Sequence, residues 1–376
     1  MTTTQHVQSI WQGPDGTEYP KDAVFYNVWD APISLHGMVP EARAAKKFTR
    51  LPDHVLPHIN EEAQRQAVRP TGIRARVLTD SPYIAVCAKL EAWTLHNSYN
   101  HRCSSGFDIY VGGPGQRKFF GVTVMPPIEG EHRMACGVAS RHNPGSLYEY
   151  TVYFPNDTRP EEVHIGVKEG CRICEPPPYT YPKPVVFYGP SITQGSTALR
   201  AGNSAVSLLG RWLNFDYINM GLSGSCWAED AIAEYLAKLD MSVLVYDYDH
   251  NAPSPEFLMK THEKLFKTVR AAQPDLPIII TPRPETSPDY FYIGDVARRR
   301  SIVFRTYENA IKDGDKRVWY VDGVDQLAGG DADSCSIDGS HLNDLGYYRL
   351  AKALERPMRR ALACSVNPGC EVGDID

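Results

Sequence analysis

Three residues have the types and the spacing for nucleophilic catalysis. Ser191 lies in the turn GPSITQG directly after an apolar run, and Asp338 and His341 share the short loop DGSH. A serine hydroxyl becomes a strong nucleophile when a neighbouring base removes its proton. A histidine serves as that base when a carboxylate fixes its tautomer and stabilises the imidazolium ion. We therefore expect Ser191, His341 and Asp338 to form a catalytic triad for acyl transfer.

Two further segments carry polar groups that follow apolar runs. The sequence NMGLSGS, residues 219–225, is a glycine-rich turn whose backbone amides can come close to a ligand. The sequence VLVYDYDHN, residues 243–251, ends in several polar side chains. One such segment alone is weak evidence, because a serine after a strand is usually a helix cap. Their order along the chain, each at the end of an expected strand, indicates one shared site.

The second half of the chain alternates short apolar strands with amphipathic helices. This alternation predicts the α/β class, with a doubly wound, mainly parallel five-stranded sheet of flavodoxin-like type. Ligands bind such sheets outside the carboxyl ends of the strands, where the segments described above lie. The expected strands are residues 185–188, 217–220, 243–246, 278–281 and 318–321, and the expected helices are residues 204–213, 228–238, 256–272, 296–312 and 345–363.

The first half has a hydrophobic period of two, in short segments separated by clusters of Gly, Pro, Asn and Asp. The pattern predicts an all-β sandwich, jelly-roll-like, ahead of the α/β sheet. One helix is expected, around residues 59–66. The expected strands are residues 73–77, 84–90, 107–111, 119–124, 147–154 and 163–167.

A proline-rich stretch, EPPPYTYPKP, separates these two patterns and favours an extended, stiff backbone. It predicts a domain boundary. The expected organisation is an N-terminal extension at residues 1–20, a β-sandwich domain at 21–174, a linker at 175–184, an α/β domain at 185–363 and a polar tail at 364–376.

The composition is that of an ordinary globular protein, with 42% hydrophobic and 22% charged residues. The net charge of −6 does not favour binding to nucleic acid or to an anionic membrane. No run approaches the roughly 18 apolar residues that span a bilayer, and residues 1–13 do not resemble a secretory signal. An odd number of cysteines, nine, argues against a disulfide framework. We therefore expect a cytoplasmic protein.

No metal or organic cofactor is expected. Cys171 and Cys174 form a CxxC pair, but the sequence around them offers no second pair of ligands for zinc. Asp247, Asp249 and His250 include metal-ligating types, yet neighbouring residues on one chain point in different directions. Both groups are more simply explained by packing and by a polar strand end.

These segments resemble the SGNH, or GDSL-type, serine hydrolases and esterases. GPSITQG resembles the family's first block, NMGLSGS its second, the sequence ending in Asn251 its third, and DGSHLNDLGYYRLAKAL its last. The resemblance covers roughly residues 183–363. In the first half, GFDIY at residues 106–110 resembles the signature of a β-domain that precedes one bacterial branch of this family. The resemblance implies ester hydrolysis by a serine nucleophile without a cofactor.

The resemblance also implies an oxyanion hole formed by the amides of Ser191 and Gly224 and the side chain of Asn251, with Gly221 as the alternative to Gly224. Two positions depart from the family pattern. Pro190 stands where the family usually has Asp, and the third block lacks the usual Gly-x-Asn-Asp. Pro190 has no N–H, but the donor at this turn is the amide of Ser191, so the hole can still form.

The expected substrate is a short-chain acyl ester, with an acetyl group on a carbohydrate or small polyol as the first expectation. That expectation comes from association, because members of the family with a preceding β-sandwich often deacetylate sugars. The expected partner is therefore a small-molecule or saccharide ester, with no nucleic acid and no membrane, and the oligomeric state stays open. The alternatives are a lipid esterase or thioesterase, an acyltransferase with the same triad, and an inactive carbohydrate-binding protein.

Overall fold

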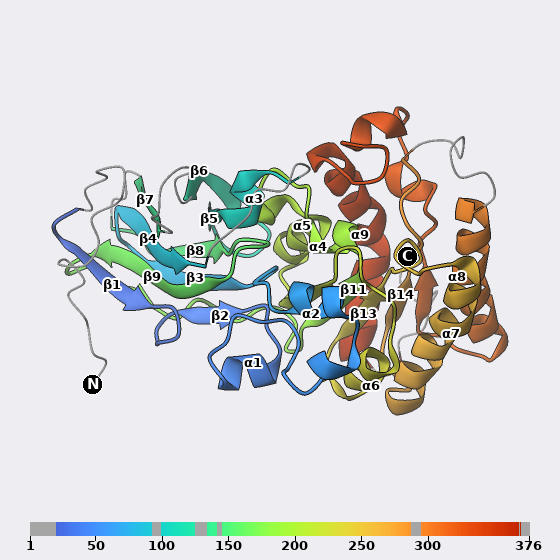
Figure 1. Cartoon of the computed structure of the whole chain (residues 1–376). Helices are drawn as coiled ribbons and strands as arrows, with labels where there is room; N and C mark the ends of the chain where they lie inside the picture. The colour runs from blue at the N-terminus through green and yellow to red at the C-terminus, as the bar shows by residue number, and fades with distance from the viewer. Residues whose placement is uncertain are drawn as a thin grey trace.

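The computed structural model describes residues 20–91, 99–124, 134–140, 145–286, 295–367 and 369. The predicted N-terminal extension lies outside these residues except for residue 20, as does most of the predicted tail. Figure 1 shows an elongated molecule with a β-rich half at one end and an α/β half at the other. Within the described residues, no helix has the length and apolarity needed to cross a bilayer.

The first half consists of two antiparallel sheets around a shared core, which confirms the predicted β-sandwich. One sheet has the order β1-β9-β4-β7, and the other has the order β10-β3-β8-β5-β6 with β2 beside β3. On β4, Ile84 and Val86 enter the shared core while Ala85 and Cys87 face the opposite side, as the pleat requires. The strands are β1 (Ala23–Asn27), β2 (Ser34–His36), β3 (Arg74–Thr79), β4 (Tyr83–Leu90), β5 (Phe107–Val111), β6 (Lys118–Val124), β7 (Met134–Ser140), β8 (Tyr148–Tyr153), β9 (Pro160–Lys168) and β10 (Ile173–Cys174).

The sequence pattern found the longer strands of this half and missed the short or weakly patterned elements. β7, with the sequence MACGVAS, is rich in small residues and shows little alternation. The expected helix corresponds to α2 (Glu61–Ala67), which Asn60 caps by accepting a hydrogen bond from the Ala63 amide. Two short helices were not expected, α1 (Pro40–Ala44) and α3 (His101–Ser105), because five residues are too few to display a helical period.

The second half contains a parallel five-stranded sheet with the order β12-β11-β13-β14-β15. This is the doubly wound, flavodoxin-like order 2-1-3-4-5, and it confirms the predicted fold class. The strands are β11 (Val185–Gly189), β12 (Tyr217–Gly221), β13 (Val243–Tyr246), β14 (Ile278–Ile280) and β15 (Val318–Tyr320). The helices are α4 (Ser191–Gln194), α5 (Ala205–Leu213), α6 (Asp230–Lys238), α7 (Pro255–Ala272), α8 (Asp295–Lys312) and α9 (Asp344–Val366).

Helices cover both faces of this sheet, so its strands are apolar on both sides. On β11, Val186 and Tyr188 pack on the side of α6, α7 and α8, whereas Val185 and Phe187 pack on the side of α5 and α9. The core on the first side continues without interruption into the sandwich of the first half. The two halves therefore share a hydrophobic core and are not connected by the linker alone.

Polar contacts reinforce this junction. The Arg74 guanidinium of β3 pairs with Asp216, just before β12, at 2.6 Å, and lies 3.7 Å from the ring centroid of Tyr217. His36 of β2 contacts the same carboxylate at 3.0 Å. Burial opposes ionisation of Asp216, but the neighbouring Arg74 and His36 lower its pKa below the ordinary value. A carboxylate beside the second sheet is thus held by two side chains of the first half.

A buried histidine in α7 makes the stability of this fold sensitive to acid. His262 is fully buried, its Nδ1 lies 2.7 Å from Thr306 Oγ1, and its ring stacks against Tyr248. Burial lowers the pKa of His262 to about 3. Because the folded-state pKa is depressed, its stabilising contribution is present above the unfolded value near 6.5 and is lost as the pH falls toward about 3.

We expect His262→Phe to reduce this acid sensitivity. Between pH 7 and pH 5, wild type should lose about 2 kcal/mol of unfolding free energy through this residue, and the variant should not. Urea denaturation at both pH values measures the difference. His58→Phe, at an exposed histidine, is the matched control and should keep the wild-type pH dependence. Equal pH dependence of His262→Phe and wild type would contradict the assignment.

Candidate active site

Ser191 lies in a sharp turn between β11 and α4. Gly189 ends the strand, and a side chain there would bring a Cβ atom within 2.1 Å of Thr193 Oγ1, so glycine allows α4 to fold back over the strand end. Pro190 precedes the first helical residue, and Gly195 ends the turn with φ +79°. Ser191 is 2% exposed, and its backbone N–H, the first of the helix, has no intrahelical acceptor. The serine hydroxyl and an amide with no acceptor among the described residues therefore lie together at the carboxyl edge of the sheet.

Asp338 and His341 form the expected carboxylate–histidine pair. His341 Nδ1 lies 2.7 Å from Asp338 Oδ2, and Asp338 Oδ1 accepts the amides of Ser340 and His341 at 2.9 and 2.7 Å. Partial burial opposes the effect, but these hydrogen bonds lower the pKa of Asp338. The carboxylate therefore holds the Nδ1–H tautomer of His341 and leaves Nε2 as the basic nitrogen.

The turn that holds Ser191 and the loop that holds Asp338 and His341 are tied together a few residues beyond these three side chains. Thr197 Oγ1 donates to the carbonyl of Leu342 at 2.7 Å, and the amide of Leu199 donates to Asp344 Oδ1 at 2.9 Å. Asn343 caps α9 immediately after this loop, with its Oδ1 3.1 Å from the Gly346 amide. Within the described part of the chain, no hydrogen bond joins Ser191 Oγ to His341 itself.

Between Gly221 and Cys226, one backbone amide has no acceptor in the part of the chain that the structure describes. The amides of Leu222, Ser223, Ser225 and Cys226 each donate to an acceptor nearby. The amide of Gly221 donates to Asn219 Oδ1 at 2.9 Å. The amide of Gly224 has no acceptor among the described residues, and Gly224 is exposed with φ +71°. Of the two glycines considered for the second block, Gly221 has its amide already engaged, and Gly224 does not within the described residues.

Asn251 joins the third block to the second. Its Oδ1 lies 3.4 Å from the amide of Cys226, two residues after Gly224. With the oxygen oriented toward this amide, the Nδ2 group has no acceptor in the described residues. The side chain of Asn251 therefore lies beside the Gly224 turn, with an N–H group that no described residue accepts.

His250, another polar residue after β13, contacts the loop that holds Asp338 and His341. His250 Nδ1 lies 3.0 Å from Arg283 Nη1, and His250 Nε2 lies 3.2 Å from Ser340 Oγ. Because arginine can only donate, Nδ1 accepts and Nε2 carries the proton that reaches Ser340. Burial, followed by the charge of Arg283, lowers the pKa of His250 to about 3. Within the described residues, no three His, Cys, Asp or Glu side chains are grouped as a metal site.

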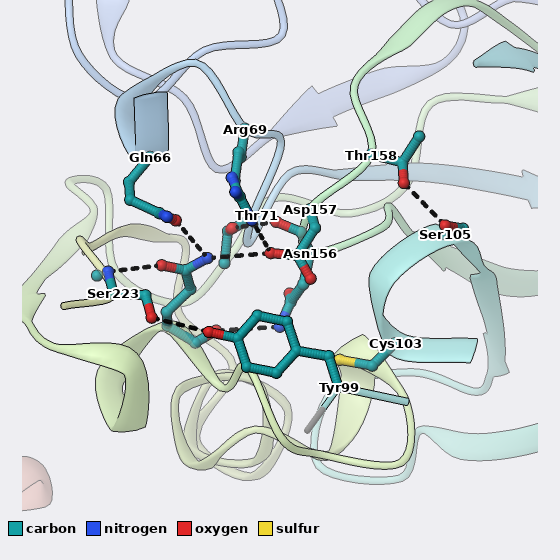
Figure 2. A network of polar contacts seen from close by, with 12 residues as sticks. Gln66, Arg69, Thr71, Tyr99, Cys103, Ser105, Asn156, Asp157, Thr158 and Ser223 are labelled. Carbon is teal, nitrogen blue, oxygen red and sulfur yellow. Dashed lines mark hydrogen bonds and ion pairs between the residues drawn. The ribbon is translucent and has the colours of Figure 1, made fainter. Parts of the chain in front are cut away.

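The first half supplies polar side chains to this site that the sequence did not reveal. Arg50 is completely buried and donates to the carbonyls of Asn219 and Gly221 at the end of β12. Asn60 Nδ2 donates to the carbonyl of Ser225 at 2.9 Å. Figure 2 shows a further group from the first half, including Gln66, Tyr99, Asn156 and Asp157, gathered beside Ser223. These residues come from several separate segments of the first half and share no period or motif, so no sequence signal could have found them.

The GFDIY segment contacts the chain that follows the Ser191 turn. Asp108 Oδ2 accepts the amide of Gly202 at 2.8 Å, and the hydroxyl of Tyr110 lies 3.3 Å from Asn203 Oδ1. A Cβ atom at Gly202 would lie 2.5 Å from the Tyr110 ring, so this contact requires glycine. The motif thus joins the sandwich to the α/β half beside the site.

Comparison with known protein families covers nearly the whole chain. Residues 182–359 match the GDSL-like lipase/acylhydrolase family, and residues 23–173 match the N-terminal domain of SGNH-hydrolase-type esterases. No curated protein matches the chain.

Three solved structures share this two-part fold. A Bacteroides ovatus protein described as a GDSL-like lipase is 24% identical with a TM-score of 0.78, over 90% of this chain and 98% of its own. The salicylyl-acyltransferase SsfX3 from a tetracycline biosynthetic pathway is 17% identical with a TM-score of 0.70, over 93% and 99%. An acetyl xylan esterase from Butyrivibrio proteoclasticus is 11% identical with a TM-score of 0.54, over 90% and 99%. The chain belongs to the SGNH, or GDSL-type, hydrolases and esterases, and carries the N-terminal β-domain of that group before its hydrolase domain.

Proposed function

We propose that this protein is a serine esterase that removes a short acyl group, with acetyl first, from a carbohydrate or small polyol. The observation that carries the proposal is the Asp338–His341 pair, joined at 2.7 Å and tied through Leu342 to the turn that holds Ser191. This arrangement supplies a nucleophile, a base with a defined tautomer and free N–H groups at one sheet edge.

In the proposed reaction, Ser191 Oγ attacks the ester carbonyl while His341 Nε2 takes the serine proton. Asp338 stabilises the resulting imidazolium through its contact with Nδ1. The tetrahedral oxyanion accepts hydrogen bonds from the amides of Ser191 and Gly224 and from Asn251 Nδ2. His341 then gives its proton to the leaving alcohol, and an acyl-serine remains.

Water completes the cycle by the reverse steps. His341 takes a proton from the water as it attacks the acyl-serine, the same donors hold the second oxyanion, and His341 returns the proton to Ser191 Oγ. The products are the carboxylic acid and the alcohol. The residues of the chain account for every proton moved.

The fold shared with an acetyl xylan esterase supports a saccharide acetate as the first substrate class. The fold shared with a salicylyl-acyltransferase supports a second candidate, transfer of the acyl group to an alcohol in place of water. Both use the same acyl-serine and differ only in what attacks it. Adding a polyol acceptor and measuring the ratio of acylated polyol to free acid separates them.

We expect kcat/KM on p-nitrophenyl esters to be highest for acetate and about 10-fold or more lower for octanoate, because a pocket shaped for a short chain rejects added methylenes. Release of acetate from acetylated xylo-oligosaccharides measures the natural class. Ser191→Ala protein sets the background in both assays. Faster hydrolysis of octanoate would favour the lipid esterase alternative, and no hydrolysis of any ester would favour a carbohydrate-binding protein.

A further inference from the structure

Gln194 connects the nucleophile turn, the Gly224 turn and the first half of the chain. We propose that it is a positioning residue, through which the first half sets the location of the Gly224 amide relative to Ser191. The proposal rests on the function proposed above, because it concerns the same oxyanion site. In this proposal the first half takes part in catalysis, which neither the family match nor the similarity to solved structures indicates.

The Gln194 side chain is fully buried, and each end has a defined partner. Its Oε1 accepts the amide of Ser223 at 3.0 Å, one residue before Gly224. Its Nε2 lies 3.3 Å from Gln66 Oε1 and 3.4 Å from Asp157 Oδ1, both from the first half. Because Ser223 can only donate from its amide, the oxygen of Gln194 must face it and the nitrogen must face the first half.

The backbone of Gln194 is held as firmly as its side chain. Asn156 Nδ2 donates to the carbonyls of Gln194 and Gly195 at 3.2 and 2.9 Å. On the other side, a Cβ atom at Gly221 would lie 2.3 Å from the Gln194 amide nitrogen, so glycine there allows α4 to touch the end of β12. The turn that carries Ser191 is thus in direct contact with the strand that leads to Gly224.

Two more contacts connect the first half to Gln194 and Ser223 (Figure 2). Arg69 pairs with Asp157 Oδ1, the oxygen that faces Gln194. The hydroxyl of Tyr99 lies 3.0 Å from Ser223 Oγ. Ser223 is therefore held from both sides, by Gln194 through its amide and by Tyr99 through its hydroxyl.

This network bears on catalysis because an oxyanion donor acts only where the charge develops. Removing one donor lowers kcat by about 10²–10³, and a misplacement of about 1 Å can cost 10²-fold. Gln194 does not touch the substrate. Its loss should move the Ser223–Gly224 peptide, so kcat should fall while KM stays nearly unchanged.

The test compares Gln194→Met with wild type in ester hydrolysis, normalised by active-site titration with a phosphonate ester. We expect kcat to fall about 10- to 100-fold, KM to change less than about 3-fold, and affinity for a boronic acid that forms a tetrahedral serine adduct to fall in parallel with kcat. Gln326→Met removes another fully buried, hydrogen-bonded glutamine and is the matched control. It should lower the melting temperature without changing kcat per titrated site.

The contribution of the first half is tested by Gln66→Met and the Gln66→Met/Gln194→Met double variant. We expect Gln66→Met to lower kcat about 3- to 10-fold and the double variant to fall no further than Gln194→Met alone, because both act through one contact. If Gln194→Met does not fold, Gln66→Met carries the test by the same kcat, KM and boronic acid readouts.

Unchanged kcat and boronic acid affinity in both single variants, or fully multiplicative losses, would overturn the proposal. If Ser191→Ala is inactive at the same time, these results reject only the positioning role of Gln194, and the proposed esterase function still stands. Full activity of Ser191→Ala would instead overturn the proposed function itself. The two failures are therefore distinguishable.

Discussion

Ser191→Ala should lower kcat for ester hydrolysis by a factor of about 10⁴ or more, with little change in KM. The reason is chemical, because alanine has no atom that can form the acyl-enzyme. The residual hydrolysis should come from direct attack of water on the ester, helped only by the oxyanion donors. Steady-state kinetics with p-nitrophenyl acetate measure the change.

Ser196→Ala is the matched control for this variant. Ser196 directly follows the same turn, its amide donates to the Ser191 carbonyl at 3.1 Å, and its hydroxyl is buried without a partner among the described residues. Its loss should leave kcat within about 3-fold of wild type, since no hydrogen bond is removed. Equal activity of the two variants would show that Ser191 is not the nucleophile.

Asp338→Asn should lower kcat by up to about 10⁴, the loss seen when the matching residue of a serine protease is changed in the same way. The asparagine oxygen can still accept the amides of Ser340 and His341, so the loop keeps its shape. Its NH₂ group, however, would face His341 Nδ1 and require that nitrogen to accept. Nε2 would then carry the proton, and the histidine could not take the proton of Ser191.

Asp333→Asn provides the comparison, since Asp333 is an exposed carboxylate five residues before Asp338, in the short 3-10 helix Ala332–Cys335. It should retain nearly full activity. NMR of the His341 ring nitrogens should show Nδ1–H in wild type and Nε2–H in Asp338→Asn. A fully active Asp338→Asn enzyme would mean that another group orients His341.

Features that are local in sequence could be predicted well. Asp338 and His341 are three residues apart, so a single loop conformation brings them together and the pairing needs no tertiary information. The parallel sheet could also be predicted, because each strand is a compact apolar run buried on both faces. Gly224 could be named only from a resemblance, and the sequence could not show that the Gly221 amide donates to Asn219 Oδ1.

The contribution of the first half could not be predicted. Arg50, Gln66 and Asn156 are polar residues of ordinary type. Arg50 reaches the end of β12, and Gln66 and Asn156 reach Gln194 of α4, only because the sandwich packs against these two elements. Polar residues at a junction between halves have no periodicity, and one sequence shows no pairing between distant positions. His250 is a similar case, because its support of Ser340 depends on a contact across 90 residues.

The central claim is that Ser191 forms the acyl-enzyme, and covalent labelling tests it most directly. Wild-type protein would be incubated with a p-nitrophenyl phosphonate, digested and analysed by mass spectrometry. We predict one phosphonyl group per chain, on the peptide that contains Ser191, with loss of activity in proportion to labelling. Labelling of a different residue, or full inactivation with Ser191 unmodified, would contradict the account.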